Sequence, residues 1–249
     1  MRLLLIRHGQ TPANVLGRLD TDPPGPGLTP LGVRQSVAVP AALRLSQIRR
    51  IYASTLVRTQ LTAEPLAEAR RLPVQVLDGL REIEAGNLED FSDPKSQMTY
   101  LMTAFAWAEG DLERRMPGGP TGHEFFTRFD SAITKVVADI AAHSEDPHSE
   151  PAGDPDGYIA AHRPAAAVFC HGMAIRTWAA SRCANIDGSY ASSHELDNTG
   201  VVVLDSAHDG NWLMSQWVSQ PVGGIVLSDD SAADPTGETL QAARRRTAG

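Results

Sequence analysis

The sequence predicts a single α/β domain built in three layers, with a mostly parallel central sheet and helices on both faces. Short apolar runs alternate along the chain with longer segments of helical periodicity, and this alternation is typical of a layered α/β sheet. The 249 residues are 42% hydrophobic and 21% charged, which is enough chain and apolar surface for one sizeable core.

The expected strands are short and apolar. Leu3–Ile6 is apolar at every position, as in a strand that is buried on both faces of a parallel sheet. A hairpin is expected near the carboxyl end, because "DSAHDGN" places an Asp-Gly pair between two apolar runs. The full set of strands is Leu3–Ile6, Ile48–Ala53, Pro73–Leu77, Ala165–Cys170, Val201–Leu204 and Trp212–Trp217, with Asp209 and Gly210 in the hairpin turn.

Several of the expected helices begin at capping residues. Thr29 followed by Pro30 is typical of a helix start, and Pro40 should kink or interrupt that helix. Ser54 is expected to cap the next helix, which carries "LVRTQLTAEPLAEARR". Three further segments are expected to be helical, two of them from the helical spacing of their apolar residues: Ser96–Glu109, Glu124–His143 and about Met173–Ala184.

Two segments lack this organisation. Residues 143–164 ("HSEDPHSEPAGDPDGYIAAHRP") are polar and rich in Pro, Gly and Asp, which predicts a long mobile surface loop. From about Pro221 the hydrophobic periodicity is lost, and the chain ends in "ARRRTAG". We therefore expect one domain over residues 1–220 and a disordered tail over residues 221–249, in which Leu240–Arg246 could form a transient helix.

Charge and cysteine content narrow the classes of function. The formal net charge is −8 and the isoelectric point is near 5.4, which argues against a nucleic-acid or anionic-membrane partner. The N-terminal apolar run is too short for a signal peptide or a membrane span. Cys170 and Cys183 have no metal-ligand spacing, and we expect both to be reduced. The sequence thus predicts a cytoplasmic protein without a metal centre.

Two of the expected buried strands end in similar motifs. Arg7 and His8 end the first strand and His171 ends the fourth, and each histidine precedes a glycine that lets a ligand approach the backbone. Ligands of open α/β sheets bind at the carboxyl ends of the strands, where Arg58 would add a second guanidinium. Guanidinium groups match phosphate oxygens, and a neutral imidazole can attack phosphorus. These residues predict a phosphoryl-transfer site.

Five motifs in order along the chain carry a resemblance to a known family. They are "RHGQTPAN" (Arg7–Asn14), "LTPLGVRQ" (Leu28–Gln35), "ASTLVRTQLTAEPLA" (Ala53–Ala67), "LREIEAGNLED" (Leu80–Asp90) and "VFCHG" (Val168–Gly172). From about residue 2 to residue 218, the chain resembles the histidine phosphatase superfamily, the phosphoglycerate mutase-like group. The resemblance implies the three-layer phosphoglycerate mutase-like fold.

The resemblance implies a role for each matching residue. His8 matches the nucleophile that takes the phosphoryl group on Nε2. Glu82 matches the general acid that protonates the leaving oxygen and then activates water. The implied phosphate-binding residues are Arg7, Arg58 and His171, with Asn14 as an accessory contact. We expect no cofactor and no metal, because two arginines and a histidine can neutralise the phosphate without a divalent ion.

The residues around Glu82 differ between the branches of the family. "LREIEAGNLEDFSDPKSQ" lacks the aromatic and glycine residues that enclose bisphosphoglycerate in the cofactor-dependent mutases, and it resembles the phosphatase branch. We therefore expect a metal-independent phosphatase that hydrolyses a phosphate monoester of a small metabolite through a phosphohistidine. The alternatives are a cofactor-dependent mutase-type phosphotransferase and a catalytically idle phospho-ligand-binding module.

Substrate selection is expected to come from Phe91–Arg115. The side chains there that could contact substrate are Tyr100, Phe105, Trp107, Arg114 and Arg115. The three aromatic residues fit a helix core at least as well. The expected partner is a small phosphate ester, and the sequence leaves the oligomeric state open, with a homodimer as one option.

Overall fold

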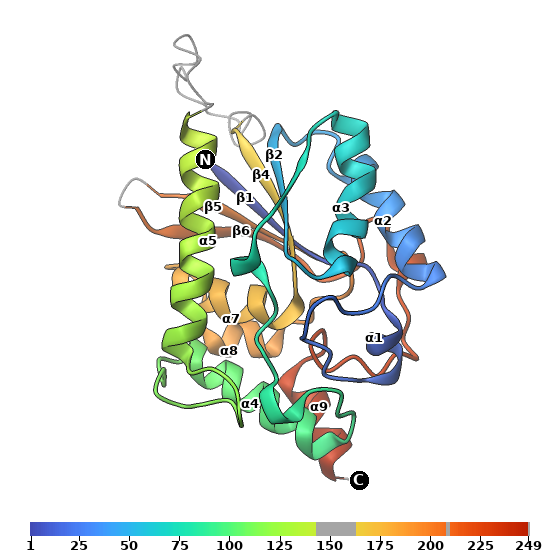
Figure 1. Ribbon diagram of the computed structural model, residues 1–249, viewed down its shortest axis with the longest axis vertical. Coiled ribbons are helices and arrows are strands. Elements are labelled where there is room, and N and C mark those ends of the chain that lie inside the picture. Colours follow the sequence, from blue (N-terminus) through green and yellow to red (C-terminus); the bar gives the residue numbers. More distant parts are fainter. Residues whose placement is uncertain (143–162, 208–209, 249) are drawn as a thin grey trace.

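A six-stranded sheet in the order β3-β2-β4-β1-β5-β6 forms the centre of the protein (Figure 1). The computed structural model describes residues 1–142, 163–207 and 210–248. The segment expected to be a mobile loop, residues 143–164, lies almost entirely outside the described residues. Asp209 of the expected hairpin turn lies outside them as well.

Four of the strands are parallel and two form an antiparallel hairpin. β1 pairs with β4, β4 with β2 and β2 with β3 in parallel, whereas β5 is antiparallel to both β1 and β6. All the predicted strands and the hairpin are therefore confirmed. Their bounds are β1 (Arg2–Arg7), β2 (Ile48–Ala53), β3 (Val74–Val76), β4 (Ala165–Cys170), β5 (Val201–Ser206) and β6 (Trp212–Val218).

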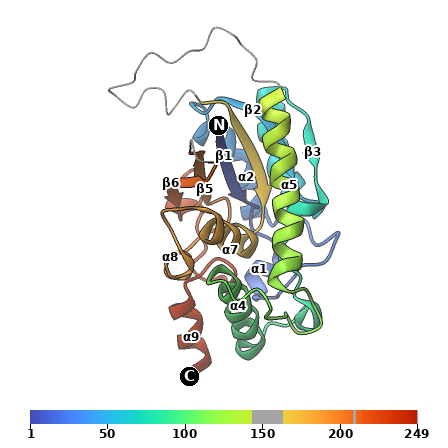
Figure 2. The same ribbon diagram turned by 90° about the vertical axis from the view of Figure 1, so that its left-hand side faces the viewer.

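Different helices cover the two faces of the sheet (Figures 1 and 2). Leu3 and Leu5 of β1 share a core with α4, α5 and α7, whereas Leu4 and Ile6 share the opposite core with α2 and α3. Alternate residues of a strand point to opposite faces, so a wholly apolar β1 suits a sheet between two helix layers. The predicted three-layer fold is confirmed.

The helices are α1 (Pro12–Leu16), α2 (Pro30–Ala42), α3 (Val57–Arg70), α4 (Pro94–Ala108), α5 (Gly122–Ala142), α7 (Gly172–Arg182), α8 (Gly188–Ser193) and α9 (Leu240–Ala248), with short 3₁₀ turns at Asp78–Leu80, Gly86–Leu88 and Ile225–Leu227. Helix α2 begins as predicted, because the Thr29 side chain accepts a hydrogen bond from the Gly32 amide at 3.0 Å. It continues through Pro40 to Ala42 instead of ending there. Pro40 has no amide hydrogen to bond to the carbonyl of Ser36, and the helix ends two residues later, at Ala42.

The chain after β6 is packed against the body, in contrast to the disordered tail expected over residues 221–249. Helix α9 lies beside α4 in both views (Figures 1 and 2), and its Ala243 is buried in the core. Arg246 forms an ion pair with Glu238 and donates a hydrogen bond to Gln97 Oε1 at 2.9 Å. The segment is held by single apolar residues and tertiary polar contacts, so it lacks the periodic stripe that identifies a helix in a sequence.

Candidate active site

His8 and His171 lie side by side because they end neighbouring strands. β1 and β4 are paired in parallel with Arg7 opposite Cys170, so the residues that follow meet at one edge of the sheet. The centroids of the two imidazole rings are 5.3 Å apart. Both side chains are buried, with 3% and 0% of their surface exposed. The structure therefore brings together the two histidines that the sequence singled out.

The backbone orients the His8 ring. Nδ1 lies 2.8 Å from the carbonyl oxygen of Gly9, which makes Nδ1 the donor of a neutral ring and leaves the lone pair on Nε2. No other hydrogen bond to the ring is found among residues 1–142, 163–207 and 210–248. Burial, followed by the positive charges of Arg58 and Arg7, holds the pKa of His8 well below its usual value. The His8 ring is therefore uncharged at neutral pH.

A small cavity of about 20 Å³ lies against His8. Arg58 and Glu82 line it as well, so it is bounded by residues that follow β1, β2 and β3. This is the edge of the sheet at which ligands of such folds bind. Arg7 and His171 are fully buried and do not line this cavity. The wall also includes Asn14, Asp20 and Thr236.

Arg58 is held by Asp20. Nη1 donates to Asp20 Oδ1 at 2.9 Å, and Nη2 donates to the Asp20 carbonyl oxygen at 2.8 Å. Burial lowers the pKa of Arg58 and the carboxylate opposes that change, so the guanidinium stays charged at neutral pH. Asp20 lies in the loop between α1 and α2. Nothing in the spacing of these residues reveals the contact, because it depends on how that loop folds over α3.

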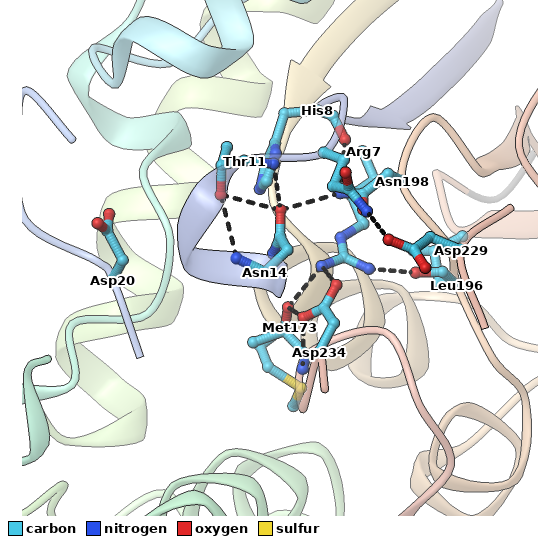
Figure 3. Close-up of polar contacts among 12 residues, drawn as sticks. Arg7, His8, Thr11, Asn14, Asp20, Met173, Leu196, Asn198, Asp229 and Asp234 are labelled. Atoms are coloured by element: carbon cyan, nitrogen blue, oxygen red, sulfur yellow. Dashed lines mark hydrogen bonds and ion pairs between the residues drawn. The ribbon is translucent and has the colours of Figure 1, made fainter. Parts of the chain in front are cut away.

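Arg7 is bound along the outer edge of its guanidinium (Figure 3). Nη1 donates to the Leu196 carbonyl oxygen at 2.7 Å. Nη2 donates to Thr236 Oγ1 at 2.8 Å and forms an ion pair with Asp234. Two of these partners belong to the C-terminal segment that the sequence did not connect with the site.

Three buried nitrogen atoms around His8 are left without hydrogen-bond partners. Six buried side-chain polar atoms of the described chain have none, and among them are Arg7 Nε, Arg58 Nε and His171 Nδ1. The two guanidiniums lie close enough to both histidines to lower the pKa of each. Buried polar atoms are nearly always paired, so this group is suited to bind an anion with several oxygen atoms, such as a phosphate.

Glu82 is held at the start of α7. Its Oε1 accepts hydrogen bonds from the backbone amides of Ile83 at 2.9 Å and Ala174 at 2.8 Å, and Oε2 accepts from Met173 at 3.1 Å. Burial raises the pKa of Glu82 and outweighs these hydrogen bonds, which oppose the change. A raised pKa keeps the carboxyl protonated to higher pH, as a general acid requires.

Ser54 contacts His171 and is not the helix cap that the sequence predicts. The residue at the cap position of α3 is Leu56, which makes no side-chain capping bond. Ser54 Oγ lies 2.7 Å from His171 Nε2. A neutral His171 that accepts this hydrogen bond carries its proton on Nδ1, the unpartnered atom. Burial, followed by the charge of Arg58, holds the pKa of His171 well below its usual value, which keeps the ring neutral.

Asn14 belongs to the start of α1 as well as to the cavity wall. Its Oδ1 accepts hydrogen bonds from the amide and hydroxyl of Thr11, at 2.9 and 3.0 Å. The Thr11 hydroxyl in turn accepts a hydrogen bond from the backbone amide of Asn14 at 3.3 Å, so the two residues cap α1 reciprocally. Asn14 therefore shapes the loop after His8, and its accessory contact with phosphate stays a prediction.

The family of this chain follows from its first 145 residues. A profile of the histidine phosphatase superfamily (branch 1) matches residues 3–145, which is more than half of the chain and includes His8, Arg58 and Glu82. The chain belongs to the histidine phosphatase superfamily. The family resemblance and the fold that it implied are confirmed.

Three curated relatives show how far the similarity extends. The PE-PGRS family protein PE_PGRS11 of Mycobacterium tuberculosis is 34% identical over 225 residues, which are 89% of this chain and 37% of that protein. This chain therefore spans little more than a third of that relative. A probable phosphoglycerate mutase, GpmB of Proteus mirabilis, is 27% identical over 94% of this chain and 98% of its own. The adenosylcobalamin/alpha-ribazole phosphatase of Salmonella typhimurium is 33% identical over 58% of this chain and 69% of its own.

Solved structures of similar proteins share the fold over most of the chain. A protein described as mycobacterial hydrolase 2 superposes with a TM-score of 0.67 at 25% identity, over 98% of this chain and 96% of its own. A mycobacterial glucosyl-3-phosphoglycerate phosphatase in complex with inorganic phosphate superposes with a TM-score of 0.64 at 25% identity, over 87% of this chain and 96% of its own.

The aromatic residues that the sequence offered for substrate selection are buried in the structure. Tyr100, Phe105 and Trp107 are 0%, 5% and 0% exposed and belong to the core, and the cavity at His8 has none of them in its wall. They are therefore helix core, which was the alternative interpretation. Arg114 and Arg115 form surface ion pairs with Asp111 and Glu124. The expectation that Phe91–Arg115 contacts substrate is not supported by this arrangement.

A methyl group at Gly172 tests the phosphate site. An added Cβ would lie 3.0 Å from Arg7 Nε and 2.8 Å from the Thr236 carbonyl oxygen. We expect Gly172→Ala to weaken vanadate binding about 10- to 100-fold, because the methyl group would cover the unpartnered Arg7 Nε and displace its surroundings. Titration calorimetry measures the affinity. The control is Gly27→Ala, whose Cβ would meet only Leu61 at 3.6 Å. Equal affinity in both variants would contradict the placement of Arg7 Nε in the phosphate site.

Proposed function

We propose that this protein is a phosphatase that hydrolyses a phosphate monoester of a small metabolite through a phosphohistidine on His8. The group of unpartnered donors carries the proposal: Arg7 Nε, Arg58 Nε and His171 Nδ1. A phosphoryl group has equatorial oxygens for these donors, and guanidinium groups bind such oxygens strongly. The uncharged Nε2 of His8, whose ring centroid is 5.3 Å from that of His171, would be the nucleophile.

The reaction takes place in two steps. First, the lone pair of His8 Nε2 attacks phosphorus, the bond from phosphorus to the ester oxygen breaks, and the Glu82 carboxyl gives its proton to that oxygen. The free alcohol then leaves. Second, the Glu82 carboxylate takes a proton from water, the oxygen of that water attacks phosphorus, and the bond to Nε2 breaks. Inorganic phosphate is released, and His8 and Glu82 return to their starting states.

Fixed positive charge supports a reaction that needs no metal. Arg7 and Arg58 are buried, at 0% and 3% exposure, and each would stabilise the charge on the phosphoryl oxygens in the transition state. Charges act more strongly in such a water-poor site than in bulk solvent. We therefore propose that the protein's own side chains supply the electrostatic stabilisation.

Most of these relatives support hydrolysis, and one of them supports a second candidate function. An alpha-ribazole phosphatase and a glucosyl-3-phosphoglycerate phosphatase are similar to this chain, which favours a small-metabolite phosphatase. The probable phosphoglycerate mutase that aligns over 94% of the chain favours a mutase-type phosphotransferase. A catalytically idle binding module would need neither a nucleophile nor a proton donor, so the pairing of His8 with Glu82 in one cavity argues against it.

The test is an assay of chelator-treated protein with a panel of phosphate monoesters. We expect release of inorganic phosphate that survives exhaustive EDTA treatment and is inhibited by vanadate. Loss of activity in EDTA that Mg²⁺ restores would contradict the metal-independent mechanism. Transfer of phosphate between positions of phosphoglycerate, without release, would identify the mutase. Binding of phosphate esters without turnover would identify the idle module.

The cellular location and the oligomeric state of the protein remain predictions. Among the helices of the described residues, none combines the length and the apolar content of a membrane span. The cytoplasmic location and the option of a homodimer come from the sequence, and both belong to this proposal.

A further inference from the structure

A short piece of the C-terminal segment encloses the Arg7 side chain. We call residues 234–237 (Asp-Pro-Thr-Gly) the Arg7 brace. Asp234 forms an ion pair with Nη2, and Thr236 Oγ1 accepts a hydrogen bond from the same nitrogen at 2.8 Å. A Cβ on Gly237 would come within 3.4 Å of Arg7 Cζ, so the backbone of the brace packs directly on the guanidinium. More than 220 residues separate Arg7 from the brace in the sequence.

The brace is itself firmly anchored. Arg176 of α7 is fully buried and donates from Nη1 to the Thr236 carbonyl oxygen at 3.0 Å. The Leu196 amide donates to the Gly237 carbonyl oxygen at 2.8 Å, and the Leu196 carbonyl oxygen accepts from Arg7. Within the brace, Thr236 Oγ1 donates to Asp234 Oδ1 at 3.0 Å. Arg7 is therefore bound by a network that is fixed to α7 and to the loop before β5.

Asp234 lies beside the phosphate cavity and not within it. The wall of the cavity at His8 contains Thr236 but not Asp234. Asp234 instead lines a separate cavity of about 320 Å³ together with Glu195 and Asp229. Figure 3 shows Asp234 and Leu196 at the guanidinium end of Arg7. The Asp234 carboxylate thus contacts Arg7 from outside the phosphate cavity. In this position it can hold the arginine without competing with phosphate.

Nε of Arg7 has no hydrogen-bond partner among the described residues. Its Nη1 and Nη2 are taken by Leu196, Thr236 and Asp234. Arg58 shows the same arrangement, because Asp20 takes its Nη atoms and Nε is left unpartnered. A guanidinium fixed in this way loses little further freedom when it binds phosphate.

We infer that Asp234 and Thr236 are positioning residues of the active site, which aim Arg7 Nε at the transferring phosphoryl group. This inference rests on the proposed function, since it assigns Arg7 to phosphate. It places residues beyond position 220 inside the functional unit. The alternative is that the Asp234 carboxylate competes with phosphate for Arg7 and so blocks phosphate binding.

The test compares Asp234→Asn with Asp230→Asn. Both changes remove one carboxylate charge from the same segment, and Asp230 is exposed and is not one of the described residues that hydrogen-bond to Arg7. Loss of a nearby negative charge alone would strengthen anion binding. We expect Asp234→Asn to weaken vanadate binding about 10- to 100-fold, because Arg7 loses its orientation, and Asp230→Asn to leave it unchanged or slightly stronger. Stronger binding by Asp234→Asn would overturn the inference in favour of a blocking carboxylate.

A double-mutant cycle separates positioning from general support of the fold. In the Arg7→Lys background, Asp234→Asn should have little further effect on vanadate affinity, because its target has been removed. Additive effects of the two changes, or a wild-type affinity in Asp234→Asn, would overturn the inference. Thr236→Val should reproduce part of the loss without a change of charge. The readout is binding by calorimetry, so it remains informative even if the wild-type protein binds vanadate without hydrolysing esters, which would count against the proposed function alone.

Discussion

The variant His8→Ala should lose turnover by about 10⁴- to 10⁶-fold, because removal of a nucleophile closes the reaction path rather than slowing one step of it. Nε2 of His8 is uncharged and directed by the bond from Nδ1 to the Gly9 carbonyl oxygen. The remaining donors of the site can still bind a phosphate ester without this nitrogen. Steady-state hydrolysis of p-nitrophenyl phosphate, with the melting temperature as a check on folding, measures the loss.

Two further histidine variants complete this experiment. His123→Ala is the matched control, since His123 is exposed and its ring contacts Glu113 at 3.1 Å; it should keep full activity. His171→Ala should retain a weak ability to form the phosphoenzyme, because it removes a phosphate donor and not the nucleophile. Near-normal turnover by His8→Ala would contradict the assignment of the nucleophile.

The second large effect concerns Glu82 and depends on the leaving group. A sugar alkoxide needs a proton as the phosphorus–oxygen bond breaks, whereas nitrophenolate leaves with little help. Glu82→Gln should therefore slow phosphorylation of His8 much more with an alkyl phosphate than with p-nitrophenyl phosphate. Arg58→Ala should slow both substrates alike, by roughly a hundredfold or more, because it acts on the phosphoryl group that they share. Single-turnover kinetics measure the phosphorylation step without the later activation of water.

Neighbouring carboxylates provide the control for Glu82. Glu84 pairs with Arg81 and Arg128, and Glu89 accepts hydrogen bonds from Thr21. The cavity wall contains only Glu82 of the three, so Glu84→Gln should show no dependence on the leaving group. If Glu82→Gln slowed both substrates equally, Glu82 would be a positioning residue and the proton donor would be another group.

The fold and the centre of the site could be predicted because they follow from local patterns. Leu3–Ile6 and Ala165–Cys170 are apolar at each position except the terminal cysteine, and such runs indicate strands buried on both faces. Residues that end parallel strands meet at one edge of the sheet. Two histidines in those positions are therefore expected to be neighbours, and in the structure their rings are 5.3 Å apart.

The remaining contacts of the site could not be predicted, because they join segments that are distant in sequence. Ser54 looks like a helix cap, and its bond to His171 becomes visible only when β2 and β4 are paired. Asp20 and Asp234 belong to segments without periodicity, and each reaches its arginine through the fold of a loop. The hydrogen bond of Tyr100 is also a tertiary contact: its hydroxyl donates to the Ile83 carbonyl oxygen at 2.9 Å, next to Glu82.

The most direct test of the central claim is isolation of the phosphoenzyme. Protein mixed with a ³²P-labelled monoester and quenched within one turnover in alkaline denaturant should carry label that is stable to base and released by acid, as expected for phosphohistidine. Peptide mapping should place that label on His8, and His8→Ala should carry none. Label on His171 would reverse the roles of the two histidines. Full hydrolytic activity with no label on any histidine would contradict the account.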